Sequence, residues 1–327
     1  MSNNILTNRH DFLLLFEVTN GNPNGDPDAG NLPRLDPNTN RGIVSDVCLK
    51  RKVRNMVDLF PPARENDAAN GYNILIKQGA VIERAQQVAI KGAKDEGCIA
   101  GESHAERAKN WLCREFFDVR TFGGVLSTGD DVMKGSAFGQ VRGPVQFTFG
   151  QSFHPITPLE ITITRCAVTK EEDAKKERTM GNKHIVPYAL YAAKGYVSPA
   201  FAEKTGFTEA DLELLFQSLL NMFEHDRSAA RGEMVVRGLY SFEHCGTQHP
   251  NNAEQNKREA RLGCAHAHKL IEGIHVDLSD KAKADGKTFP ESFADYQVRC
   301  DWTEANLPRG IKLHLRHDGS SIGPKQG

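Results

Sequence analysis

The sequence lacks the long apolar runs of a membrane protein and the paired cysteines of a secreted one. No apolar run approaches the ~18 residues of a membrane span, and the N-terminus does not show the pattern of a signal peptide. The seven cysteines form no Cys-x-x-Cys pair, and their odd number favours a reduced, intracellular protein. We therefore expect a soluble, cytoplasmic protein without a membrane partner.

The sequence also lacks an excess of charge of either sign. Among its 327 residues, 41 are basic and 42 are acidic, so the net charge is −1. This balance excludes a global electrostatic attraction to nucleic acid, and any surface that binds a polyanion must be a local patch.

Recognisable catalytic and metal-binding motifs are missing as well. Gly-x-Gly-x-x-Gly does not occur. Cys264, His266 and His268 lie close together in the sequence, but no second cluster with zinc spacing completes a site. The set of recognisable catalytic residues is therefore small, and we expect no metal and no cofactor.

What the sequence does contain is organised around the stretch from Arg9 to Phe60. Asp11–Thr19 holds six large apolar residues in nine, which is typical of a strand buried inside a sheet. Residues 20–40 carry six Asn, four Pro and three Gly, so this segment favours successive turns. Ser45-Asp46 then predicts the start of a helix, with a capping hydroxyl and an acid in the first turn.

The predicted helix has two different faces. One is an apolar stripe that we expect to pack on the sheet, formed by Leu49, Val53, Met56, Val57 and Phe60. The other is basic and projects away from the stripe, with Lys50, Arg51 and Arg54. This basic face is either an ordinary solvated surface or a ridge that binds phosphate groups.

The rest of the chain mixes strand-like and helical patterns. Residues 65–130 are mostly helical, and alternating strands follow at Val145–Phe149 and Leu159–Ile163. Thr208–Phe223 predicts a helix capped by Thr208 with Asp211 three residues later. This order indicates an α+β fold, and the simplest core that tolerates it is a ferredoxin-like or RRM-like sheet. The aromatic octapeptide of RRM domains is absent, so base stacking on the sheet is not expected.

Residues 169–184 interrupt the sheet with a charged excursion. Five basic and four acidic residues surround Met180, its one large apolar side chain, so this segment cannot bury a core of its own. It is either a disordered loop or an arm ordered by a partner, and its place between two strand-like runs favours a β-hairpin arm. Together with Lys134 and Arg142, its cations suit a curved polyanion better than a small phosphate.

Several motifs, in order along nearly the whole chain, resemble one family. Ser45–Arg51 resembles the Ser-x-x-x-Leu-Lys-Arg helix start of the backbone subunits of CRISPR Cascade complexes, the Cas seven family of the RAMP superfamily. The Asn20–Pro27 loop resembles the type I-C branch. The further matching segments are Phe117–Gly123, Gly139–Gln146, Arg178–Gly181 and Ala229–Met234.

The resemblance implies an RRM-like (ferredoxin-like) palm with a helical insertion and a protruding β-hairpin thumb. The palm would comprise residues 1–64, 131–168 and 186–327, the insertion residues 65–130 and the thumb residues 169–185. Met180 would be the wedge of the thumb against a displaced base. The implied RNA-binding residues are Arg41, Ser45, Lys50, Arg51, Arg54, Lys134, Gln140, Arg142, Arg178, Thr179, Met180, Lys183 and His184.

The resemblance also implies a non-catalytic role in prokaryotic antiviral defence. Copies of the chain would polymerise head to tail along a CRISPR RNA and present it for pairing with target DNA. Further partners would be the handle-binding subunit and the large subunit of Cascade. Two alternatives remain open: a RAMP-type endoribonuclease that processes CRISPR RNA with His184 or His244 as its base, and a metabolic α/β enzyme whose loop at residues 121–143 cradles a phosphate.

Overall fold

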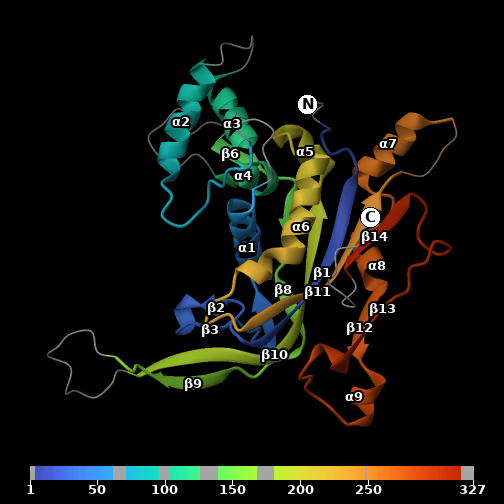
Figure 1. Ribbon diagram of the computed structural model, residues 1–327. Coiled ribbons are helices and arrows are strands. Elements are labelled where there is room, and N and C mark those ends of the chain that lie inside the picture. The colour runs from blue at the N-terminus through green and yellow to red at the C-terminus, as the bar shows by residue number, and fades with distance from the viewer. Residues whose placement is uncertain are drawn as a thin grey trace.

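The computed structural model describes residues 4–61, 71–95, 103–125, 139–167, 180–246, 249 and 251–317. At its centre, strand β1 (Arg9–Gly21) pairs antiparallel with β10 (Met180–Val197) on one side and β11 (Glu233–His244) on the other (Figure 1). Every residue of β1 from His10 to Val18 is buried. The predicted buried strand is therefore confirmed.

The strand order identifies the fold. The main path of the sheet is β14-β11-β1-β10-β8-β4, in which β14 (Ile311–His317), β8 (Gly150–Pro155) and β4 (Arg41–Val44) complete the set. In chain order, β1, α1 (Asp46–Leu59), β8, β10, α6 (Glu209–His225) and β11 follow the β-α-β-β-α-β scheme of the ferredoxin-like fold. The predicted α+β, ferredoxin-like (RRM-like) sheet is confirmed.

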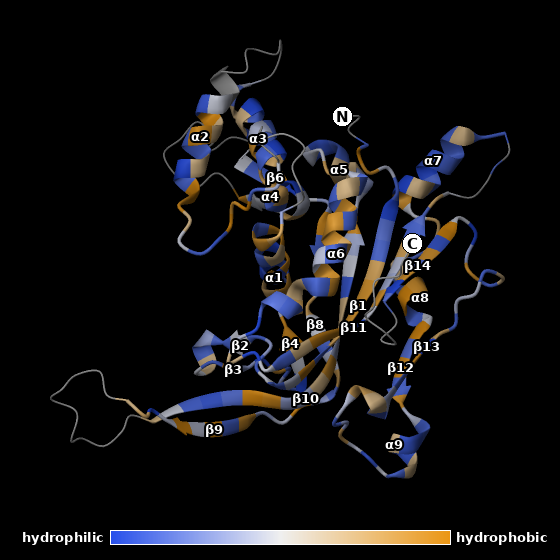
Figure 2. Ribbon diagram, viewed as in Figure 1, coloured by the Kyte–Doolittle hydropathy of each residue, from blue (hydrophilic) through white to orange (hydrophobic). Residues whose placement is uncertain are grey.

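Hydrophobic cores cover both faces of this sheet. Phe12, Leu14 and Phe16 point toward helices α1 and α6, which lie on one face, and the Phe12 and Phe216 rings meet edge-on at 5.5 Å. Leu13 and Leu15 point the other way and pack with residues of α8 (Ala267–Glu272) and β12 (Ile274–Leu278). In Figure 2 helix α6, which faces the sheet, is largely orange, whereas helix α7 is largely blue. Both faces of the central strand β1 are therefore covered.

The described residues between α1 and β6, here called the insertion, are mostly helical. It contains α2 (Ile82–Asp95), α3 (His104–Glu115), α4 (Phe117–Phe122) and β5 (Gly123–Val125), and β5 pairs with β6 (Gln140–Arg142). The remaining elements are β2 (Gly25–Asp26), η1 (Pro27–Ala29), β3 (Leu32–Pro33), β7 (Val145–Phe147), β9 (Leu159–Thr164), α5 (Pro199–Thr205), α7 (Ala253–Leu262), α9 (Asp280–Ala284), η4 (Phe293–Asp295) and β13 (Tyr296–Cys300). No helix of the described segments is long and apolar enough to cross a membrane.

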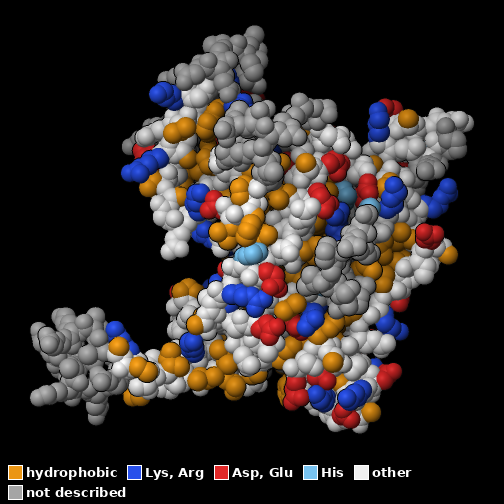
Figure 3. Space-filling model, in the orientation of Figure 1, with side chains coloured by type: hydrophobic (Ala, Val, Ile, Leu, Met, Phe, Trp, Pro, Cys, Tyr) orange, Lys and Arg blue, Asp and Glu red, His pale blue; other side chains and the backbone are white. Residues whose placement is uncertain are grey.

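A two-stranded arm extends from the sheet. It consists of β9 and the first residues of β10, paired so that Ile185 lies opposite Leu159 and Met180 lies opposite Thr164. All residues of β9 are exposed, and Figure 3 shows hydrophobic side chains along the arm. The strand predicted at Leu159–Ile163 thus exists, but it belongs to the arm and is not a half-buried strand of the central sheet. The arm begins earlier in the chain than expected.

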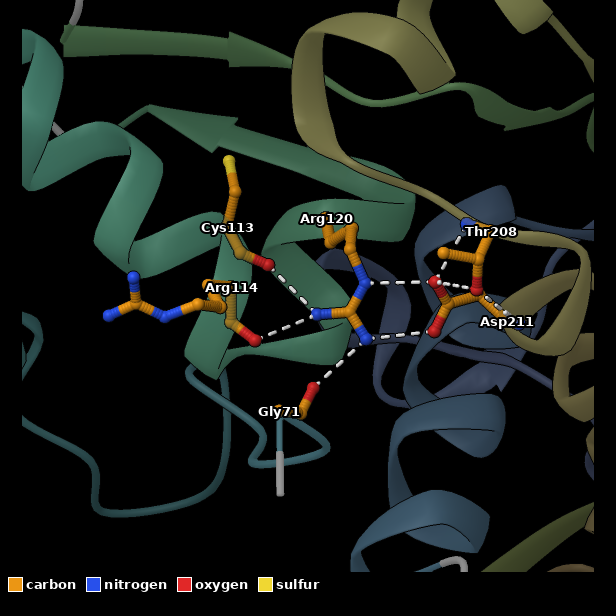
Figure 4. A network of polar contacts seen from close by, with 6 residues as sticks. All are labelled: Gly71, Cys113, Arg114, Arg120, Thr208 and Asp211. Atoms are coloured by element: carbon orange, nitrogen blue, oxygen red, sulfur yellow. Dashed lines mark hydrogen bonds and ion pairs between the residues drawn. The ribbon is translucent and has the colours of Figure 1, made fainter. Parts of the chain in front are cut away.

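Arg120 fixes the insertion to the rest of the fold (Figure 4). Its guanidinium binds both carboxylate oxygens of Asp211, with Nη2 at 2.8 Å and Nε at 3.0 Å. The remaining donors reach the carbonyls of Cys113, Arg114 and Gly71. All five N–H groups of this buried side chain are therefore used. Asp211 in turn completes the predicted capping box of α6.

We expect Arg120→Lys to lower the free energy of unfolding by about 3 kcal/mol or more, because lysine cannot reproduce the fork and leaves buried acceptors unsatisfied. Urea unfolding monitored by circular dichroism measures this change. Arg227→Lys is the matched control, since Arg227 pairs with Glu224 on the surface. Equal stability of the two variants would contradict the assigned role of Arg120.

His10, which is buried, and Glu243, which is half-buried, lie opposite each other on β1 and β11. Burial lowers the pKa of His10 from 6.5 to about 4, although the Glu243 charge acts in the opposite direction. Burial alone would raise the pKa of Glu243, but hydrogen bonds from His314 and Asn8 bring it from 4.5 to about 2. The folded protein thus holds His10 neutral and Glu243 ionised in mildly acidic solution.

Stability should consequently fall in two steps as the pH decreases. Between pH 6.5 and about 4 the unfolded chain binds a proton at His10 and the folded protein does not, so stability is lost across this range. The contribution of Glu243 is lost between pH 4.5 and about 2. Neither ring nitrogen of His10 has a partner among the described residues, so His10→Leu should fold and lack the upper step. Urea midpoints across this range provide the test, and an unchanged profile in His10→Leu would refute the assignment.

Candidate nucleic-acid interface

The Asn-rich loop between β1 and β4 is shaped by its own backbone geometry. Asn20, Asn31 and Asn40 have positive φ angles of 50°, 66° and 54°, a left-handed conformation that asparagine adopts more readily than most residues. The Asn22 side chain donates to the carbonyl of Asn31 at 2.8 Å, and β2 pairs with β3. The asparagine content of this loop therefore has a structural cause within the chain.

Ser45 connects this loop to α1, but its hydroxyl does not cap the helix. The residue has the extended backbone of an N-cap, with φ −67° and ψ 151°. Its backbone N–H and its hydroxyl both donate to Oδ1 of Asn24, each at 2.8 Å. The predicted capping hydroxyl is wrong, because this side chain anchors the loop instead. The predicted acid of the first turn is present as Asp46.

Residues 226–232, between α6 and β11, attach the loop to α1. Lys52 of α1 is almost fully buried, and its amine pairs with the carboxylate of Asp226. Burial lowers the pKa of this amine, and the Asp226 contact opposes that shift. Arg231 lies 3.5 Å from Asp226 and donates to the carbonyl of Pro23 at 2.9 Å. The sequence patterns did not predict this network. Lys52 lies in a helix with several other charged residues, and nothing in the sequence distinguishes this buried lysine from a charged residue that is exposed to solvent.

The insertion covers part of the basic face of α1. Nη1 of Arg51 donates to the carbonyl of Ile76 at 3.1 Å. Nε of Arg54 donates to Oδ2 of Asp118 at 2.8 Å, and the Asp118 carboxylate also accepts the backbone N–H groups of Leu75 and Ile76. Both cations therefore have partners within the chain.

Lys50 lies on the same covered side. Its amine pairs with Asp46 at 2.9 Å and lies 5.9 Å from the centre of the Phe122 ring. The side chains of Lys50 and Arg54 are each only 12% exposed. The prediction of a basic face that projects freely from α1 is therefore wrong. The insertion binds Arg51 and Arg54, and Asp46 in the first turn of α1 binds Lys50. A contact of these residues with RNA stays a prediction.

The predicted residues that remain open to solvent lie elsewhere. Arg41, at the start of edge strand β4, is exposed, as is Gln140 at the start of β6. Arg142 is exposed too, with its guanidinium 5.1 Å from the centre of the Phe201 ring. Lys134, Arg178 and Thr179 lie outside the described residues.

The arm has two chemically different faces, because residues directly opposite each other in an antiparallel pair share a face. Met180, Asn182 and His184 lie opposite Thr164, Thr162 and Glu160, so this face is largely polar. The other face carries the exposed side chains of Leu159, Ile161 and Ile163. Met180 is 69% exposed.

The arm and the insertion flank one side of the molecule, and the outline between them is concave in Figure 3. At the foot of the arm, Lys183 donates to the carbonyl of Ala229 at 3.2 Å, which joins the arm to the segment 226–232. The loop anchored by Ser45 belongs to the same region. The segment 226–232 and the Asn-rich loop, which are far apart in the sequence, are thus brought together beside the arm.

Within the part of the chain that the structure describes, neither histidine considered as a catalytic base lies in a catalytic group. His244 is fully buried, accepts from the backbone N–H of Cys264 at 2.9 Å, and contacts Asp11 through its other nitrogen at 2.9 Å. That arrangement is typical of a core histidine with both nitrogens satisfied. His184 is half-buried on the arm, and its Nδ1 has no partner among the described residues. In the same residues, no three His, Cys, Asp or Glu side chains gather as a metal site.

These features define an α+β protein with a ferredoxin-like sheet, both faces covered, and an exposed β-hairpin arm. The family model for CRISPR-associated protein Cas7 matches residues 8–301. The chain therefore belongs to the Cas7 family.

The match to an individual relative covers less of this chain than the match to the family model does. A CRISPR-associated protein Cas7 of Haloferax volcanii is 28% identical over 226 residues, which cover 64% of this chain and 62% of that protein. The alignment thus spans less than two thirds of the length of this relative.

Solved structures give distant likenesses. A chain of a "CRISPR RNA-guided surveillance complex, pre-nicking" is 17% identical with a TM-score of 0.47, over 72% of this chain and 75% of that one. A chain of a further "CRISPR RNA-guided surveillance complex" is 14% identical with a TM-score of 0.43, over 81% and 80%.

Proposed function

We propose that this chain is a non-catalytic, CRISPR RNA-binding backbone subunit of a type I-C Cascade complex. Copies polymerise head to tail along the guide and present it for pairing with target DNA in antiviral defence. The observation that carries this proposal is the match of the Cas7 family model across residues 8–301. Further partners in this proposal are the handle-binding subunit and the large subunit, and the protein acts in the cytoplasm.

The shape of the fold supports backbone binding of RNA beside the arm. Both faces of β1 are covered, so bases cannot stack on this central strand as they do on the open sheet of an RRM. Arg41 and Arg142 are exposed cations, and the arm supplies Met180 with neighbouring polar side chains. A guide held by its phosphates keeps its base edges free for pairing, which is what RNA-guided recognition requires.

The charge balance supports polymerisation. A net charge of −1 with 41 basic residues leaves 42 acidic residues to meet the basic surface of a neighbouring copy. Head-to-tail contacts of one kind, which do not close into a ring, produce a helical filament. The balanced charge of the chain suits such an assembly.

Co-expression with a repeat–spacer array, followed by sizing and sequencing of the bound RNA, tests the proposal. A purified complex that contains several copies of the chain on one spacer-derived RNA is the expected result. Incubation of the purified protein with repeat RNA separates the scaffold from a RAMP-type endoribonuclease. A stable complex supports the scaffold, and cleavage of the repeat would overturn the non-catalytic role.

Exposed cations should contribute to affinity through phosphate contacts. We expect Arg142→Ala to weaken the binding of all guide sequences alike, and to flatten the salt dependence by ~0.7 log units per lost single-strand contact. Lys257→Ala is the matched control, since Lys257 is an exposed cation on the distant helix α7. Fluorescence anisotropy over a range of salt concentrations measures both quantities. An Arg142→Ala slope equal to that of the control would contradict a phosphate contact at this position.

The arm should divide the guide at regular intervals. If each copy places Met180 against a displaced base, that nucleotide cannot pair with target, and a mismatch there carries no cost. Unstacking a base costs a few kcal/mol, so neighbouring contacts must compensate. A target library that contains every single mismatch should reveal tolerated positions at a constant spacing. A penalty profile without periodicity would refute this role of the arm.

A further inference from the structure

A cavity of about 360 Å³ lies at the foot of the arm. Its walls come from three parts of the chain: His154–Thr157 at the end of β8, Pro187–Ala189 where β10 leaves the sheet, and Phe289–Glu291 with the nearby Tyr296. Figure 1 shows the segment that contains α9 beside the point where the arm begins. A volume of this size lies in the usual range of small-ligand sites.

Four of the lining residues carry aromatic rings: His154, Tyr188, Phe289 and Tyr296. The Tyr296 ring centre lies 5.4 Å from that of His154 and 6.5 Å from that of Tyr188. The Phe289 ring also lines the cavity and is 58% exposed, so one large apolar ring stands uncovered at its open side. Such a wall offers flat π-faces to a planar ligand.

The polar groups of the cavity suit an uncharged ligand. Nδ1 of His154 lies 2.9 Å from the Tyr296 hydroxyl. Burial, with the nearby Arg41 charge, lowers the pKa of His154, so its ring is neutral near pH 7. Glu291 is the one charged side chain among the described lining residues, and it pairs with Lys287 at 2.8 Å. With no cation in its lining, the cavity does not favour a phosphate or a carboxylate.

Positive charge lies at the rim instead. Arg41 pairs with Pro155 in the β4–β8 ladder, which places its exposed side chain next to the cavity wall. A neutral aromatic slot with a cation at its edge is complementary to a nucleotide, whose base is planar and uncharged and whose phosphate is anionic. An apolar side chain of a protein would make no use of Arg41.

We propose that this cavity holds one unstacked base of the bound single-stranded RNA, with Arg41 on the adjacent phosphate. The inference rests on the proposed RNA-binding function and assigns that function a contact away from the tip of the arm. Tyr188 lies eight residues beyond Met180 along β10, a distance of about 26 Å at ~3.3 Å per residue. The cavity and Met180 therefore contact different nucleotides.

Photo-crosslinking of the full chain bound to single-stranded RNA that contains thiouridine tests the proposal. Trypsin cleaves after Lys287 and Arg299, so the aromatic residues Phe289 and Tyr296 fall in one peptide, 288–299. We expect a crosslink in this peptide. Phe289→Ala should reduce its yield and weaken RNA binding by roughly tenfold, which is the scale of one base-stacking contact.

Phe149→Ala is the matched control, because Phe149 is 59% exposed and precedes β8 at the end opposite His154. It should change neither affinity nor crosslinking. If RNA binds without a crosslink in peptide 288–299, and Phe289→Ala binds as the wild type does, the cavity assignment is wrong and the proposed function stands. If the wild-type chain binds no RNA, both fall. If Phe289→Ala reduces only the number of copies on one RNA, the cavity receives a side chain of a neighbouring copy, and the proposal is overturned.

Discussion

The burial of β1 on both faces is the constraint on which the rest of the structure depends. Helices α1 and α6 occupy one face of the sheet, and α8 with β12 occupies the other. A ferredoxin-like sheet covered in this way cannot bind RNA as an RRM does, through bases stacked on an open face. An RNA bound as proposed must therefore meet the parts of the protein beyond the edges of the sheet, namely the arm, the Asn-rich loop and the border of the insertion. Because the central strand is covered on both faces, the core of the protein supports these peripheral elements, which are the parts left free to contact a ligand.

Local patterns predicted the elements of the fold better than the directions of their polar side chains. Six apolar residues in nine predicted β1, because density alone marks a strand inside a sheet. The partners of Arg54 and Ser45 could not be predicted, since Asp118 and Asn24 arrive from other parts of the chain. A residue preferred at an N-cap can give its hydroxyl to a closer acceptor, and a helical cation can be covered by an inserted domain. Only the folded structure, in which these distant segments pack together, shows which of these outcomes occurs.

Burial separates two kinds of residue that a family motif presents together. The segment Phe117–Gly123 helped to establish the resemblance, yet Asp118 and Arg120 are buried and satisfied by groups of the same chain. Their chemistry is structural: unpaired, each would leave a charge in the interior at a cost of several kcal/mol. Arg142, which belongs to another of these motifs, is exposed. A family motif can therefore contain both structural and ligand-binding residues. The solvent exposure of each residue shows which of them can reach a ligand.

The arm couples two kinds of contact through one hairpin. Its Met180 face is polar, and its opposite face carries Leu159, Ile161 and Ile163 in the open. An apolar row on a hairpin without a core gains most from cover by another protein surface, whereas the polar face suits nucleic acid. A head-to-tail filament of the proposed kind satisfies both demands at once, because RNA and the next copy approach the same arm from different sides. Assembly and guide binding would then reinforce each other: a copy that covers the apolar face also fixes the polar face against the RNA.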